Sequence, residues 1–421
     1  MLKLPFRRNK VGFVIKEASN PIPSSLQFFQ TTKTLLAVSW LNTLANSLSN
    51  IFVNIFLFKV TEQFGIVVLF NLMMYIAWLP AFVAAGWLGK RTSKRNGLII
   101  GNSFQFVFYL CILLLGEQAG DHVVLLGLLF GVGSGFYWLS INVMSVDYTT
   151  NSNRDWFNGV NGMVNSISQM LGPFLAGLFI VNFERLSGYY IIFGCSFVIF
   201  FFTILLSLQF PREDGEKKFY WREMLAVHGN REWRALTYAF MANAFRGGVL
   251  SFVILVWVFM VTKDESALGA FSLLSTGLTF LMYYMVGKYG KGKRRLKYML
   301  IGNVFLSIAL LGLVFEVSWT TLLIYGVLSG ICMPLFELPF HTIALNNISD
   351  HDQKGKLRME LVVAREAALS IGRISSVLML YAIYNIDGHS QIYIQGFIIL
   401  VVLIGLLPHL FLRSVSRGIT Q

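Results

Sequence analysis

The sequence predicts an all-α integral membrane protein in which twelve transmembrane helices form two six-helix, pseudo-symmetric halves. Hydrophobic residues make up 55% of the 421 residues and charged residues only 13%, whereas a soluble globular chain carries about 25% charged residues. The mean hydropathy is +0.63, and the apolar residues gather into long runs with basic residues in alternate gaps. Too few charges remain to cover a water-facing surface.

Each apolar run is long enough for one spanning helix, which needs about 20 mostly apolar residues. Only helices and closed barrels satisfy their backbone groups in lipid, and barrel strands are shorter segments of alternating polarity. The runs therefore predict helices over residues 34–58, 66–88, 97–116, 122–146, 159–182, 189–209, 236–261, 267–287, 298–316, 320–345, 361–385 and 391–412.

The basic residues set the expected orientation. With both termini in the cytoplasm, the inside segments carry 28 Lys and Arg and the outside loops carry 3, as the positive-inside rule requires. We expect a cytoplasmic tail at 1–33, bundles at 34–209 and 236–421, and a cytoplasmic linker at 210–235 with a short amphipathic helix around 220–229. The net charge of +13 lies in these loops, so it indicates no nucleic-acid partner.

The two halves contain matching segments in the same order. Gly101–Asn102 corresponds to Gly302–Asn303 at an offset of 201 residues. "FGVGSG" at 130–135 corresponds to "YGVLSG" at 325–330 at an offset of 195. Several matches at nearly one offset predict a duplicated six-helix unit.

Two segments resemble transporter motifs. "SQMLGPFLAG", which ends at Gly177, contains Gly172 and Pro173; a Gly-Pro pair allows both a bend and close helix approach. It resembles the antiporter signature g-x-x-x-G-P-x-x-G-G of the major facilitator superfamily of secondary transporters. The alternative interpretation is an ordinary kinked helix.

The loop after the second run reads "GWLGKRTSKR" at 86–95. It resembles the same family's G-x-L-a-D-r-x-G-r-k motif at Gly86, Arg91, Lys94 and Arg95, but Lys90 takes the acidic position. A positive-inside anchor is the alternative interpretation of this loop. The resemblance covers essentially the whole chain, and it implies a central cavity lined by spans one, four, seven and ten.

The first span carries asparagines four residues apart, at 42, 46, 50 and 54. A buried amide costs about 2 kcal/mol or more without a partner. At 3.6 residues per turn, these residues and nearby Ser and Thr cover an arc of roughly 160°, so this span faces protein or water rather than lipid. We expect Asn46 and Asn50 to face the cavity and Asn54 to pack toward a neighbouring helix.

Span four carries Trp138 and Asn142 one helical turn apart. An indole and an amide at this spacing suit stacking on a ligand and hydrogen bonding to it. A core tryptophan beside a packed amide is the alternative.

Ionisable residues inside spans are costly and usually face a cavity or a partner. Glu337 lies between Pro334 and Pro339, and both prolines remove helix hydrogen bonds. We therefore expect a broken helix around the carboxylate, as in many transporter sites. Glu337 is a candidate proton-coupling group with His341 as a relay.

Arg246 and Arg373 lie near the middle of spans seven and eleven. Either arginine is a candidate ion-pair partner of Glu337, which is the alternative to proton coupling. Together the two arginines and Glu337 carry +1, which favours a substrate with an anionic or strongly polar group.

These features predict a secondary active transporter that works by alternating access, with proton-coupled efflux of a small or amphipathic, polar or anionic substrate. A lipid-linked saccharide flippase, an uptake symporter and a non-transporting receptor or scaffold are the alternatives. No phosphate-binding loop or CxxC metal spacing is present in the sequence. A solvated loop explains "SDHD" at 349–352 better than a catalytic site does, so we expect no cofactor and no enzyme activity. The expected partners are protons, membrane lipids and a small-molecule or lipid-like substrate, and the expected form is a monomer in the plasma membrane.

Overall fold

The fold is a bundle of long helices. The computed structural model describes residues 25–148, 154–212, 218–289, 295–352, 357–387 and 391–419, and these residues contain no strand. Twelve helices in this part of the chain are long and apolar enough to cross a membrane. The predicted all-α membrane class is confirmed, whereas residues 1–24 of the expected tail lie outside the described residues.

The first six spans form the N-half. They are α1 (Ser25–Thr61), α2 (Phe64–Arg91), α3 (Lys94–Leu115), α4 (Val123–Asp147), α5 (Arg154–Ile180) and α6 (Ser187–Ser207), with a short 3₁₀ helix η1 (Gly116–Gly120) before α4.

The last six spans form the C-half. They are α8 (Arg231–Thr262), α9 (Glu265–Tyr289), α10 (Arg295–Phe315), α11 (Trp319–His351), α12 (Arg358–Asp387) and α13 (Gln391–Ile419). The linker contains the expected short helix, α7 (Trp221–Ala226), which continues into η2 (Val227–Gly229).

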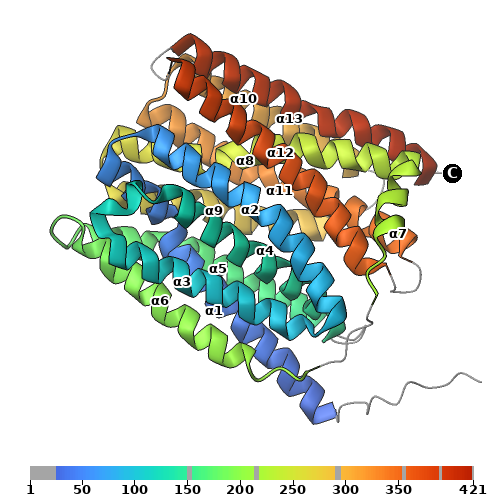
Figure 1. Cartoon of the computed structure of the whole chain (residues 1–421). Coiled ribbons are helices and arrows are strands. Elements are labelled where there is room, and N and C mark those ends of the chain that lie inside the picture. The colour runs from blue at the N-terminus through green and yellow to red at the C-terminus, as the bar shows by residue number, and fades with distance from the viewer. Residues whose placement is uncertain are drawn as a thin grey trace, which may run out of the picture.

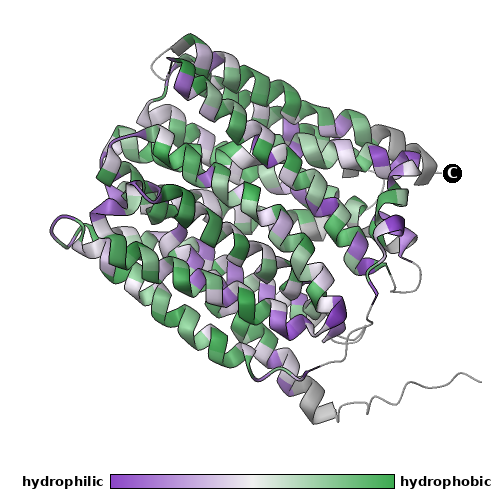
Figure 2. Ribbon diagram, viewed as in Figure 1, coloured by the Kyte–Doolittle hydropathy of each residue, from purple (hydrophilic) through white to green (hydrophobic). Residues whose placement is uncertain are grey.

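The twelve long helices run roughly side by side, and hydrophobic residues cover their flanks (Figures 1 and 2). Hydrophilic residues gather at the two ends of the bundle (Figure 2). We call the end that holds α7 and the C-terminal end of α13 the linker face (Figure 1). The other end, where α1 turns into α2 and α8 into α9, is the opposite face.

The repeated Gly-Asn pairs perform the same packing role in both halves. A Cβ atom on Gly101 of α3 would lie 2.6 Å from the backbone nitrogen of Tyr137 on α4. A Cβ atom on Gly302 of α10 would lie 2.7 Å from the carbonyl oxygen of Cys332 on α11. Each glycine therefore allows the third and fourth helices of its half to approach closely.

One expectation is wrong: α11 is not broken at its two prolines. It runs without interruption through Pro334 and Pro339 from Trp319 to His351. A proline removes one backbone hydrogen bond, and neighbouring helices and local adjustments compensate for it in membrane helices. Glu337 is therefore presented by a continuous helix.

Candidate functional site

A central cavity of about 770 Å³ lies between the N-half and the C-half. Ligand pockets typically measure about 300–1,000 Å³, so this volume suits a small molecule. Residues of α1, α2, α3, α4 and α5 line it from one half and residues of α8, α9, α10, α11 and α12 from the other. The predicted site residues on its wall are Asn46, Asn50, Trp138, Pro173, Arg246, Glu337 and Arg373.

The two ends of the asparagine series bind neighbouring helices. Asn42 Nδ2 donates to Asn102 Oδ1 at 3.0 Å and to Gln105 Oε1 at 2.8 Å, both on α3. Asn71 Nδ2 on α2 donates to Asn54 Oδ1 at 2.7 Å. These side chains therefore join α1 to the rest of the N-half.

The middle of the series keeps hydrogen-bonding capacity free. Asn46 Nδ2 donates to the carbonyl oxygen and to Oδ1 of Asn42, each at 3.0 Å. Asn46 Oδ1 is buried and has no hydrogen-bond partner among the described residues.

Three other residues of the cavity wall resemble Asn46 in this respect. Trp78 Nε1, Asn165 Oδ1 and Ser272 Oγ are also buried and have no hydrogen-bond partner in the described part of the chain. Leaving such a group unpaired costs about 1–3 kcal/mol. The four atoms themselves are covered, so they do not face the cavity space. The uncharged amide and hydroxyl side chains that line the cavity, among them Asn50, Gln169 and Ser251, suit an uncharged polar ligand.

Trp138 and Asn142 do not act as one unit. Trp138 is 46% exposed, lies on the cavity wall and contacts Tyr137 edge to face at 5.5 Å between ring centroids. Asn142 is half-buried and does not line this cavity. It lies one turn nearer the linker face, so the expected joint contact with a ligand is not supported.

Glu337 belongs to a chain of polar side chains in the C-half. Its Oε1 accepts a hydrogen bond from Asn243 Nδ2 at 3.2 Å, and its Oε2 lies 2.9 Å from His341 Nε2. Asn243 Oδ1 accepts in turn from Arg246 Nη2 at 3.2 Å. Arg246 also donates to Asn303 of α10. Glu337 therefore contacts Arg246 only through Asn243, and the direct ion pair expected as the alternative is not formed between the described residues.

Arg373 pairs with another carboxylate. Its Nη1 donates to Glu366 Oε1 at 2.7 Å, and its guanidinium lies 5.4 Å from the ring centroid of Trp78 on α2. Glu366 is buried, and its carboxylate pairs with Arg373 inside α12. Arg365 directly precedes Glu366 in the same helix, so Arg246, Arg365, Arg373, Glu337 and Glu366 together still sum to +1.

A buried ion pair joins the two halves at the linker face. Lys90 Nζ on α2 donates to Glu360 Oε1 on α12 at 2.7 Å, and the two side chains are 7% and 0% exposed. The backbone nitrogen of Tyr220 in the linker donates to the same oxygen at 3.0 Å. Lys90, which stands where the loop motif has an acidic residue, therefore joins α2 to α12, and Glu360 joins α12 to the linker.

A second polar contact joins the halves at the opposite face. Lys59 at the end of α1 pairs with Glu265 at the start of α9. Tyr189 of α6 donates its hydroxyl to the same Glu265 oxygen at 2.6 Å. The central cavity therefore lies between two inter-half ion pairs.

The glycines of the antiporter-like motif allow α5 to pack closely on two helices. A Cβ atom on Gly172 would lie 2.7 Å from Ser47 Cβ on α1, and one on Gly177 would lie 2.4 Å from the carbonyl oxygen of Glu265 on α9. Pro173 lines the cavity between them. This motif therefore contributes one of the contacts between the halves.

The loop-motif residues lie at the linker face. A Cβ atom on Gly86 would lie 3.2 Å from Val363 on α12. Arg91 lies over the ring of Trp87 at 4.3 Å from its centroid, and Lys94 pairs with Asp147 of α4. Arg95 is half-buried in the first turn of α3.

Sequence reasoning missed several residues of the site. Trp78 carries no motif that could have revealed it, because its role depends on a contact between α2 and α12. Glu366 was expected to form a gate or an interfacial pair with Arg365, and its partner is Arg373 of the same helix. Asn243 had a signal, because it follows Asn42 at the same offset of 201 residues as the Gly-Asn pairs. Both asparagines make hydrogen bonds near the Asn of that pair, directly for Asn42 and through Arg246 for Asn243.

A twelve-helix bundle with a polar cavity between its halves has the architecture of secondary membrane transporters. The sequence model described as Major Facilitator Superfamily matches residues 35–275. The chain belongs to the Major Facilitator Superfamily and is an integral, multi-pass membrane protein.

Known proteins agree with this assignment. The chain is 36% identical over 345 residues to "Uncharacterized protein YqgE" of Bacillus subtilis (strain 168), which covers 82% of this chain and 80% of that one. A POT family transporter in complex with a thioalcohol-conjugated peptide has a similar fold, with a TM-score of 0.70 and 11% identity over 93% of this chain and 97% of that one. A D-xylose-proton symporter aligns with a TM-score of 0.66 and 15% identity over 92% and 97%.

Proposed function

We propose that this protein is a secondary active transporter that moves a small polar or amphipathic molecule through the central cavity by alternating access. One observation carries the proposal: a cavity lined by polar side chains lies between two halves that ion pairs join at both faces. If the halves rock, one ion pair opens while the other holds, and the cavity is exposed to one side at a time.

Proton coupling is assigned to Glu337. Its carboxylate lines the cavity and contacts His341, which lies one turn nearer the linker face and has a 59% exposed side chain. This pair offers a route for a proton between the cavity and that face. Efflux is the proposed direction, because the segment resembles an antiporter signature and its Gly177 lies at a contact between the halves.

The linker face is assigned to the cytoplasm of the plasma membrane. The excess of Lys and Arg in the segments that end at this face supports the assignment. Both halves of one chain complete the cavity, so a monomer suffices for transport.

The test begins with a thermal-shift screen of polar and amphipathic compounds, and the compound that stabilises the purified protein most is used as substrate in proteoliposomes. We expect an imposed pH gradient to drive its transport. Glu337→Gln is expected to abolish the proton-driven component and to retain exchange of labelled for unlabelled substrate. Glu316→Gln, the same change at an exposed residue before α11, is the control. Full proton-driven transport by Glu337→Gln would exclude the coupling role.

A further inference from the structure

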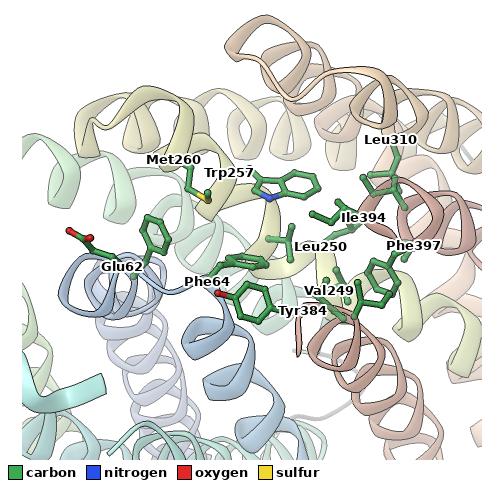
Figure 3. A pocket seen from close by; sticks show the side chains of 16 residues that line it. Glu62, Phe64, Val249, Leu250, Trp257, Met260, Leu310, Tyr384, Ile394 and Phe397 are labelled. Atoms are coloured by element: carbon green, nitrogen blue, oxygen red, sulfur yellow. The ribbon is translucent and has the colours of Figure 1, made fainter. Parts of the chain in front are cut away.

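A second cavity of about 230 Å³ lies near the opposite face, between the junction of α1 and α2 and the helices α8, α10, α12 and α13 (Figure 3). Its wall is formed almost entirely by hydrophobic side chains. They include Val249, Val253, Trp257, Leu310, Ile394 and Phe397.

The chemistry of this wall selects an apolar occupant. Glu62 is the one charged residue among the described residues that line it, and its carboxylate points away from the cavity (Figure 3). An apolar cavity of about 150 Å³ stays dry and binds a molecule such as benzene. A larger cavity of the same kind suits several methylene groups of an alkyl chain.

The apolar cavity adjoins the central polar cavity. Leu250 of α8 lines both, Val249 and Val253 face the apolar one, and Gly247 and Ser251 face the polar one. A single side chain, that of Leu250, is therefore shared by the walls of the polar and the apolar cavity.

Both halves contribute to the apolar wall. Phe64 of α2 contacts Tyr384 of α12 with ring centroids 6.2 Å apart. A Cβ atom on the adjacent Gly65 would lie 2.3 Å from the Tyr384 ring. The cavity is thus closed by a contact between the halves, and a rocking motion that separates α2 from α12 would open it.

We propose that the apolar cavity binds the alkyl chain of an amphipathic ligand whose uncharged polar head occupies the central cavity. The inference rests on the proposed function for the head-binding site and narrows the substrate class to single-chain amphiphiles with a hydroxyl-bearing head. Hydroxyl groups match the amide side chains of the cavity wall, such as Asn46, Asn50 and Asn165, since both kinds of group donate and accept hydrogen bonds.

The test uses the full chain in lipid nanodiscs with two photoreactive probes. One probe is an alkyl β-glucoside with a diazirine near the end of a ten-carbon chain, and the other is a phosphatidylcholine with the same diazirine chain. After irradiation, labelled residues are located by mass spectrometry. We expect the glucoside to label α8 and α13 at residues of the apolar cavity.

Two variants fill the cavity, and two make the same chemical change on the exposed surface of α6. Val253→Phe and Leu310→Phe are expected to reduce glucoside labelling about tenfold or more, because the new ring displaces two or more methylenes. Val198→Phe and Leu205→Phe, at exposed positions, are expected to leave labelling unchanged. Elution volume and melting temperature establish that each variant folds.

The variant Asn46→Ala tests whether the polar head binds in the central cavity. It is expected to weaken labelling by the glucoside and to leave labelling by phosphatidylcholine unchanged. Labelling that is spread evenly over exposed helix surfaces, or that survives both filling variants, would overturn the proposal. Labelling by the glucoside that survives Asn46→Ala would also overturn it, in favour of a site for bilayer lipid chains alone. Intact cavity labelling without any transport would contradict the proposed function and not this site.

Discussion

At the residue scale, three asparagines of one helix face perform two different tasks. Asn42 and Asn54 form hydrogen bonds with α3 and α2, whereas Oδ1 of Asn46 has no hydrogen-bond partner among the described residues. The four-residue spacing predicts a polar face but cannot assign these tasks. The assignment depends on which neighbouring helix offers an amide, and the spacing within α1 carries no information about α2 or α3.

This division predicts opposite effects for two equivalent substitutions. Asn46→Ala is expected to abolish most substrate binding and to change the melting temperature little, because its side chain bonds only to its own helix. Asn42→Ala is expected to cost about 1–3 kcal/mol of stability, because Asn102 and Gln105 lose their partner. Binding and melting curves of both variants check this, and equal losses in both measurements would refute the division.

At the element scale, α2 contacts α12 and α5 contacts α9, and these contacts join the two halves. Lys90 and Glu360 form a charge pair with the lysine on α2, where the family motif has an acid. The sequence shows the departure at position 90 but not its partner, which lies 270 residues further along the chain.

Reversing this pair tests it. Lys90→Glu places two carboxylates together in a buried site, where breaking an ion pair costs about 3–5 kcal/mol. The linker face is expected to open, and the double variant Lys90→Glu with Glu360→Lys is expected to close it again.

The readout is the labelling rate of Asn46→Cys by a membrane-impermeant thiol reagent added at the linker face. It is measured after replacement of Cys111, Cys195 and Cys332. Each shift of about 1.4 kcal/mol in the equilibrium changes the open population tenfold. Lack of rescue in the double variant would show that the pair does not hold this face.

The contact between α5 and α9 yields a second prediction at this scale. Gly177→Ala places a methyl group against the carbonyl oxygen of Glu265, at 2.4 Å without relaxation. We expect a loss of about 1–3 kcal/mol from overpacking. Gly194→Ala on α6 meets nothing within 4 Å, so it is expected to be neutral or slightly stabilising. Thermal unfolding of both variants compares them, and a stable Gly177→Ala would contradict the packing account.

At the scale of the whole molecule, the hydropathy and repeat patterns predicted the twelve spans and the paired halves correctly. A span needs only length and apolarity, which one sequence contains. The contacts of Glu337 with Asn243 and of Lys90 with Glu360 join different helices and were not predictable in this way. The prediction of a broken helix at Pro334 and Pro339 was wrong. It considered only the backbone hydrogen bonds that proline removes, and neighbouring helices can compensate for that loss.

The central claim is that each face opens while the other stays closed, and double electron–electron resonance on spin-labelled pairs tests it most directly. Asn158 with Met285 reports the linker face and Glu62 with Ile386 the opposite face, and all four residues are exposed. We expect Lys90→Glu to lengthen only the first distance and Glu265→Lys to lengthen only the second. Both distances lengthening together, or neither responding to either variant, would contradict alternating access in this protein.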